Sequence, residues 1–263
     1  MSGFNLRFLG HSTVRLELGG RVVLTDPVLT ARVGGLSRVV ALPPPESYAD
    51  VNLVLLSHLH GDHLHLPSLK LLGKNTRIVV PRGAGGWLAK KGFKAVEEIA
   101  PGETLNDGGL TVTATEAVHS GHRWGPRLTH GPQSPALGHL IESDGKKIYN
   151  AGDTDLFDGM AAFGPVDVAL LPVWGWGPNL GPGHLDPARA AKAAERVQAR
   201  AAVPVHWGTL ALPGLKRTAR MRRLLADPPR VFAAEVEAAG GATEVLFTEP
   251  GADVVLPAQT DRA

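Results

Sequence analysis

The chain has 263 residues and no cysteine, so disulfide bonds, thiolate metal ligands and a cysteine nucleophile are excluded. Its 43% hydrophobic and 20% charged residues are typical of a globular protein, and its net charge of +2 is too small to indicate nucleic-acid binding. No apolar run reaches the roughly 18 residues that a membrane-spanning helix needs; we therefore expect a cytoplasmic protein that binds neither nucleic acid nor membrane.

The first half of the chain alternates β-rich segments with turns. Gly19-Gly20 separates two such segments and predicts a hairpin, whereas consecutive prolines indicate a loop over residues 34–48. Residues 51–56 form an almost continuous apolar run, which is typical of a strand covered on both faces. The predicted strands cover residues 4–9, 13–18, 21–25, 51–56 and 76–80, and the predicted helices cover residues 67–72 and 85–91.

The second half continues in the same style. Asp186-Pro187 is a good N-cap and first-turn pair, and it opens an alanine-rich helix that runs to about residue 199. Further strands are predicted over residues 110–118, 137–143, 146–151, 166–171, 201–205, 243–247 and 253–256, and further helices over residues 214–226 and 229–239. These elements indicate a mixed α/β (α+β) chain that forms one domain over residues 1–263.

The predicted helix over residues 214–226 carries a cluster of positive charge. Leu215, Met221, Leu224 and Leu225 are expected to form its buried side. We therefore interpret the cations as a solvated outer face, rather than as a surface for nucleic acid or anionic lipid. They are Lys216, Arg217, Arg220, Arg222 and Arg223.

A histidine-rich segment, SHLHGDH at residues 57–63, directly follows the buried strand predicted at residues 51–56. In an extended chain His58 and His60 point to the same side and can hold one ion, and Gly61 permits a turn that aims Asp62 and His63 at a second. Imidazole and carboxylate ligands suit zinc and also accept manganese or iron. The segment predicts a metal site beyond a strand end; the alternative is a solvated histidine-rich turn.

Residues 58–63 match the HxHxDH signature of the metallo-β-lactamase-fold hydrolases. That family has three further ligands in the order His, Asp, His, each just after a strand, and this chain offers His119, Asp153 and His206 at such places. The resemblance extends from about residue 9 to residue 208. It implies a four-layer αββα fold in a single domain.

The resemblance also implies a centre of two divalent metal ions, with zinc favoured and manganese as the alternative. Metal-bound hydroxide would attack an ester, lactone or phosphodiester bond in a small-molecule substrate. Asp62 and Asp153 thereby take part in catalysis, and Asp153 would bridge the ions. One ion would be held by His58, His60 and His119, and the other by Asp62, His63 and His206.

Two residues are expected to support these ligands. Asp26, at a predicted strand end, matches an aspartate with which the family orients a ligand histidine; the alternative is a simple turn cap. His11 is a weaker candidate, because a turn role after the first strand is an equally good interpretation.

Details around the predicted site resemble one sub-branch, the L-ascorbate-6-phosphate lactonase group. They are Gly10-His11-Ser12, Thr25-Asp26-Pro27, residues 183–187 (GHLDP) and residues 204–208 (PVHWG). A near relative of that group is the N-acyl-phosphatidylethanolamine-hydrolysing phospholipase D. The resemblance implies a catalytic His184 beside the metals, for substrate binding or general acid–base work. The alternative is a loop histidine bonded to the backbone.

Aromatic and basic residues next to the predicted site are candidates for the substrate pocket. Trp174, Trp176 and Trp207 could stack on a sugar ring or an acyl group, and Arg123 could clamp a phosphate or carboxylate. Ordinary core packing and a solvated arginine are the alternatives.

Two other functions stay open. A phospholipase D-type phosphodiesterase needs an apolar groove and a membrane-docking surface, and the first residues of the chain show no amphipathic stretch to supply one. A non-catalytic metal-binding protein on the same fold would be expected to have lost ligands. A homo-oligomer is left open.

Overall fold

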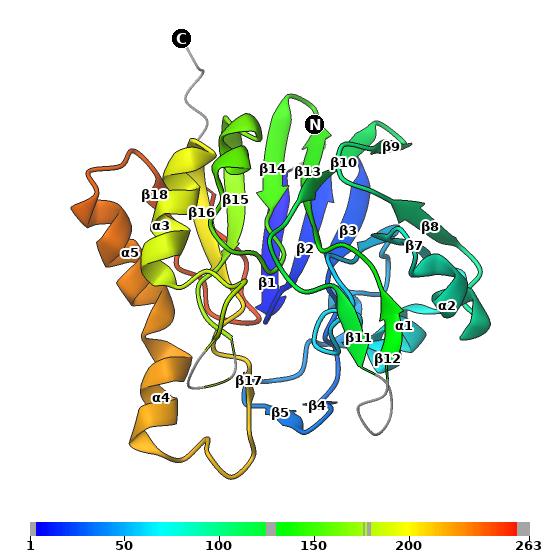
Figure 1. The fold of residues 1–263 in the computed structure, drawn as a ribbon, viewed down its shortest axis with the longest axis horizontal. Coiled ribbons are helices and arrows are strands. Elements are labelled where there is room, and N and C mark those ends of the chain that lie inside the picture. Colours follow the sequence, from blue (N-terminus) through cyan, green and yellow to red (C-terminus); the bar gives the residue numbers. More distant parts are fainter. Residues whose placement is uncertain (1–3, 125–129, 176, 178–179, 257–263) are drawn as a thin grey trace.

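Two mixed β-sheets pack face to face in the structure, a computed structural model that describes residues 4–124, 130–175, 177 and 180–256 (Figure 1). In spatial order the first sheet contains β1 (Asn5–Gly10), β2 (Thr13–Leu18), β3 (Arg21–Thr25), β6 (Leu53–Leu55), β7 (Arg77–Pro81) and β8 (Val96–Ile99). The second contains β18 (Glu244–Val245), β16 (Ala199–Val205), β15 (Val166–Pro172), β14 (Lys146–Asn150), β13 (Leu137–Ser143), β10 (Leu110–Glu116) and β9 (Thr104–Asp107).

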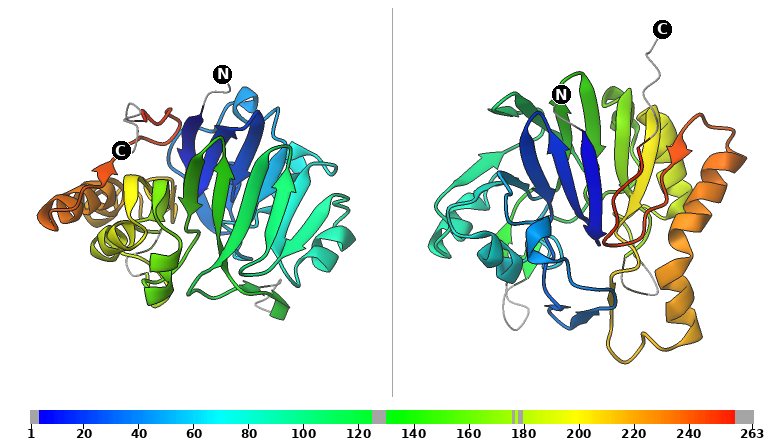
Figure 2. Two further views of the ribbon diagram at one scale, coloured as in Figure 1. Left: turned by 90° about the horizontal axis from the view of Figure 1, so that it is seen from above. Right: turned by 180° about the vertical axis from the view of Figure 1, so that it is seen from behind.

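Helices cover the outer faces of both sheets (Figure 2). Both faces of the first sheet are apolar, as strand β6 and the residue after it show. Leu53 and Leu55 lie in the main core between the sheets, whereas Val54 and Leu56 lie in a second cluster under the helices. The helices are α1 (Leu66–Leu72) and α2 (Gly85–Lys90) on the first sheet, and α3 (Pro187–Arg196), α4 (Ala219–Ala226) and α5 (Pro228–Ala238) on the side of the second. The four-layer αββα arrangement is thus confirmed.

The remaining described elements are short, and the strands among them lie beyond one end of the sandwich (Figure 1). They are β4 (Arg32–Val33), β5 (Leu36–Arg38) and β17 (Leu210–Ala211) in one small sheet, β11 (His122–Trp124) and β12 (His130–Gln133) in another, and the 3-10 helices η1 (Pro45–Ser47) and η3 (Asp158–Ala162). None of them was predicted, because two or three paired residues are too few to show alternation. Strands β8 and β9 were also missed, since their sequences, VEEI and TLND, are too polar to indicate a strand.

The C-terminal predictions need three corrections. The predicted strand over residues 253–256 is only a single bridge between Arg7 and Asp253. The helix predicted from residue 214 begins at Ala219, because the Thr218 side chain caps it, and Leu215 is 41% exposed instead of buried. Helix α3 ends at Arg196, so β16 starts two residues earlier than predicted. No helix among the described residues is long and apolar enough to cross a membrane.

A buried arginine ties the small sheet to the main fold. Arg38 is 9% exposed. Its guanidinium donates to the carbonyl groups of Leu9, Val28 and Ala41. Burial lowers the pKa of Arg38 to about 10, which still leaves it charged at neutral pH.

We predict that Arg38→Met lowers the free energy of unfolding by about 2–4 kcal/mol, because buried carbonyl groups lose their donors. Urea denaturation measures the change. Arg32→Met is the matched control: Arg32 lies in the same hairpin but is exposed, so its loss should change stability by less than about 0.5 kcal/mol. Equal effects of the two substitutions would mean that the buried donor contributes nothing specific.

Candidate metal centre

The histidine-rich segment leaves the end of β6 and is held by a buried carboxylate from the end of β3. Asp26 is 0% exposed and accepts three hydrogen bonds: from Ser57 N (2.8 Å), Ser57 Oγ (2.6 Å) and His63 Nδ1 (2.8 Å). Its backbone is left-handed, with a φ of +35°, and His11 and His206 also have positive φ values of 56° and 62°. Such strain persists only where the surrounding structure enforces it.

Three imidazoles form the first group of candidate ligands. His58 Nε2 lies 3.0 Å from His60 Nδ1, and His119 Nε2 lies 3.1 Å from the same His60 atom. The ligand atoms of the three residues all lie within 4.8 Å of one another. A single cation between them would therefore have three nitrogen ligands.

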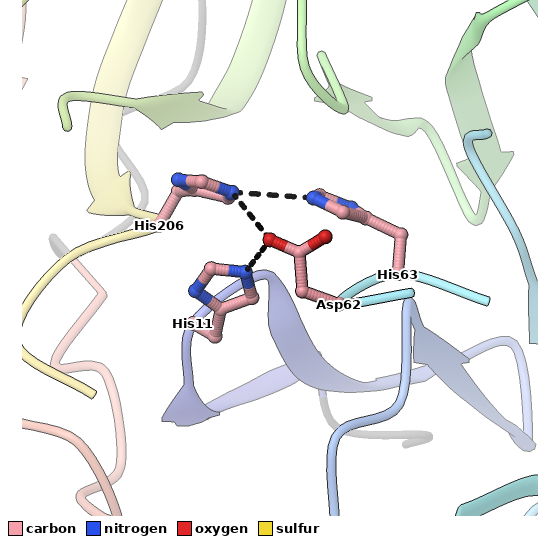
Figure 3. Close-up of side chains that lie close together, drawn as sticks. All are labelled: His11, Asp62, His63 and His206. Atoms are coloured by element: carbon pink, nitrogen blue, oxygen red, sulfur yellow. Dashed lines mark hydrogen bonds and ion pairs between the residues drawn. The ribbon is translucent and has the colours of Figure 1, made fainter. Parts of the chain in front are cut away.

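A second group lies beside the first (Figure 3). His63 Nε2 and His206 Nε2 are 3.2 Å apart, and Asp62 Oδ2 lies 3.9 Å from His206 Nε2. His11 Nε2 is 3.1 Å from the same Asp62 oxygen, so the structure adds His11 to this group, where the sequence suggested only a supporting role. The group offers three nitrogens and one carboxylate.

Asp153 stands between the two groups. Its Oδ2 atom is 3.3 Å from both His63 Nε2 and His206 Nε2, and 4.0 Å from His58 Nε2. Its Oδ1 atom is buried and has no hydrogen-bond partner among the described residues. A buried carboxylate oxygen without a partner costs free energy unless something positive binds it.

In two of the histidine rings, the hydrogen bond made by Nδ1 determines whether Nε2 can bind a cation. His119 Nδ1 and His206 Nδ1 each lie 2.6 Å from a carbonyl oxygen, that of Gly183 and that of Trp174, and must carry the proton to donate to it. Their Nε2 atoms then present lone pairs to the centre. These lone pairs face neighbouring ring nitrogens at 3.1–3.2 Å, so a cation between the rings could bind both nitrogens of each pair. The donor set therefore fits divalent metal ions.

The protonation states agree with this fit. Burial lowers the pKa of His60 to about 4 and that of His206 to about 3, and it lowers the pKa of His58 well below its usual value, so these rings are neutral at neutral pH. His63 is the exception: burial opposes its charge, but Asp153 and Asp26 outweigh burial and raise its pKa above the usual value. Cation binding at His63 therefore requires the release of a proton. The imidazoles hold the pKa of Asp153 well below its usual range despite burial. Ionised carboxylates and neutral imidazoles are the forms that bind cations.

His184 lies at the edge of the cluster. Its Nε2 atom is 3.8 Å from Asp153 Oδ2, its Nδ1 atom donates to the carbonyl of Pro182 at 3.2 Å, and its side chain is 24% exposed. The ring meets that of His119 edge to face, with centroids 4.6 Å apart. His184 therefore combines contact with the cluster and access to solvent.

The predicted substrate residues lie in different surroundings. Trp207 is 3% exposed and stacks on Phe8 in the core, and the ring of Trp174 is also buried, at 5% exposure, so neither forms an open pocket wall. Trp176 lies outside the described residues. The Nη1 atom of Arg123 donates to the carbonyl groups of Leu59, within the histidine-rich segment, and Leu64, directly after it.

Three supporting groups were not identified from the sequence. The carbonyl groups of Gly183 and Trp174 carry no sequence signal, because any residue supplies a carbonyl. Ser57 could have been found, since it stands between the buried strand and His58; its hydroxyl donates to Asp26 and lies 2.9 Å from His58 Nδ1.

Comparisons with known proteins agree with this geometry. The family model described as "Beta-lactamase superfamily domain" matches residues 21–207. A UPF0173 metal-dependent hydrolase of Pyrococcus abyssi is 34% identical over 78% of this chain and 84% of its own length, and one of Thermococcus kodakarensis is 32% identical over 95% and 99%. The structure of Igni18, a metallo hydrolase of Ignicoccus hospitalis, superposes with a TM-score of 0.69 at 26% identity, covering 95% of this chain and 97% of Igni18.

The fold, the two ligand groups and these matches define a metal-dependent hydrolase of the metallo-β-lactamase superfamily, and the chain belongs to its UPF0173 metal-dependent hydrolase family.

We predict that Asp26→Asn lowers zinc affinity by about 10- to 100-fold, the usual cost of losing a partner that orients a ligand histidine. Asparagine tolerates the left-handed backbone but supplies one acceptor oxygen where the carboxylate supplies two. Competition with a chromogenic chelator measures the affinity. Asp50→Asn, which removes an exposed carboxylate paired with Arg15, is the control and should bind zinc like the unmodified chain. Equal affinities would show that Asp26 does not orient a ligand.

Proposed function

We propose that the chain hydrolyses an ester, lactone or phosphodiester bond at a centre of two divalent cations, with zinc favoured over manganese. The observation that carries the proposal is the pair of ligand groups that share Asp153 between them. One cation would be held by His58, His60 and His119, the other by Asp62, His63 and His206, and Asp153 would contact both. His11 is a further candidate ligand for the second cation.

When bound, two cations acidify a water molecule and polarise the oxygen of the bond under attack. The chain's own residues supply the rest. The buried, ionised Asp153 contacts both ligand groups, with 3.3 Å to His63 and His206 of the second group and 4.0 Å to His58 of the first. In the hydrolysis, the water oxygen adds to the carbonyl carbon or phosphorus, the bond to the leaving oxygen breaks, and that oxygen takes up a proton.

His184 is the residue that we propose for the proton transfer. Its Nε2 atom faces the cluster, and its partial exposure lets it exchange protons with solvent. In its protonated form it would give a proton from Nε2 to the leaving oxygen and recover one from water.

A panel of chromogenic esters, lactones and phosphodiesters tests the proposal. Chelator-treated protein should be inactive, and two equivalents of zinc or manganese should restore turnover of at least one substrate class. The bond class that is cleaved also separates a lactonase from a phospholipase D-type phosphodiesterase. Protein that binds two cations tightly yet hydrolyses no member of the panel would instead support a non-catalytic metal-binding role.

Asp153→Ala is expected to remove one bound cation and nearly all turnover, with the fold retained. Two cations would otherwise face each other with one negative charge fewer between them. Metal content by plasma emission and far-UV circular dichroism check both parts. Asp158→Ala is the control, because that carboxylate is fully exposed and pairs only with Arg196 among the described residues. Two cations bound at full occupancy in Asp153→Ala would mean that Asp153 does not bridge.

His184→Ala should retain both cations and lose roughly 10²–10⁴-fold in kcat, the usual contribution of a general acid. An ester with a very acidic leaving group should be spared most of this loss, since its departure needs little protonation. The kcat values of an activated and an unactivated ester therefore separate the roles. A small loss that is equal for both esters would identify His184 as a structural loop residue.

A further inference from the structure

A pocket of about 450 Å³ opens next to the candidate centre, between the β4–β5 hairpin and the start of α1. Asp62, a candidate ligand, forms part of its lining, so a molecule bound at the cations has direct access to it. Most of the wall is apolar: Val33 and Leu36 from the hairpin, and Leu66 and Pro67 from the first turn of α1.

The polar groups of the pocket are occupied by other parts of the chain. Arg123 uses Nη1 to bind two carbonyl groups, and its guanidinium lies over the ring of Trp87, 5.3 Å from the centroid. His65 lies 2.8 Å from the Ser68 hydroxyl through Nδ1. The apolar side chains therefore define what the pocket can recognise.

The walls are fixed before a ligand arrives. Val33 and Leu36 pack with Val28 and Leu210 in a small hydrophobic cluster, and β5 pairs with β17, the short strand that follows His206. A preformed apolar wall binds an apolar group without an ordering cost.

Resting on the proposed function, we propose that this pocket, the Leu36 pocket, binds an uncharged apolar acyl chain of the substrate. The substrate class is then a carboxylic ester or lactone with an aliphatic acyl part, and the reacting carbonyl lies at the cations beside Asp62.

The test uses the zinc- or manganese-loaded protein and 4-nitrophenyl esters that share one leaving group and differ in the acyl chain. From butanoate to hexanoate, kcat/KM should rise by up to about fourfold for each added methylene group, the ratio that full burial of one methylene gives. A ratio near one across the series, with measurable turnover, would overturn the proposal.

Two variants link the effect to the pocket. Leu66→Gln places a polar, uncharged side chain in the wall and should bring the ratio below about twofold per methylene group. Leu71→Gln makes the same change on the same helix at a side chain that is 54% exposed and outside the pocket, and should keep the full ratio. If Leu66→Gln fails to fold, the exposed Pro67→Gln replaces it. A full ratio in the wall variant contradicts the proposal.

A binding measurement separates failure of the inference from failure of the proposed function. NMR titration of the metal-free protein should give a lower Kd for hexanamide than for butanamide, and Leu66→Gln should abolish the difference while Leu71→Gln keeps it. If no ester, lactone or phosphodiester is hydrolysed, the proposed function fails, and these Kd ratios still decide about the pocket. Equal Kd values for the two amides in the unmodified chain would contradict the proposal that the Leu36 pocket binds an acyl chain.

Discussion

Buried ring nitrogens that face one another at 3.0–3.2 Å are the constraint on which the candidate centre depends. Water cannot separate them, because the rings are buried, and protonation is unfavourable for most of them for the same reason. The fold keeps them in place from outside, through carbonyl groups and Asp26 on the opposite ring nitrogens. Such an arrangement of buried imidazoles and ionised carboxylates suits cations in the space between the rings.

This constraint explains where strain occurs in the backbone. His11, Asp26 and His206 have left-handed φ values although none is glycine, and each of them contributes a side chain to the cluster or to its support. The strands before them end in a core of fully buried Leu, Val and Ala side chains that holds the chain direction fixed. A large core can stabilise a few strained residues at its edge, and the centre lies at that edge.

The parts of the site that could be predicted from the sequence are those with a dense local pattern. The segment 58–63 and the distant His119, Asp153 and His206 all lie in the cluster, because strands of both sheets end on the same side of the sandwich. Their partners could not be predicted, since a carbonyl such as Gly183 O has no residue signature. Trp207 shows a related limit. It directly follows the candidate ligand His206 in the sequence, but its own side chain lies in the core.

The same limit applies to the substrate. His119 and His206 follow strands of seven residues each, and the histidine-rich segment follows the apolar run at residues 51–56, whereas the Leu36 pocket is built from β4, β5 and the first turn of α1. Two- and three-residue strands carry almost no periodicity, so the elements that shape substrate binding are those that sequence analysis identifies least well. Relatives that share the ligands can therefore differ in this hairpin without any change in the fold. The ligand set defines the class of chemistry, and in our proposal the hairpin beside Asp62 selects the acyl group.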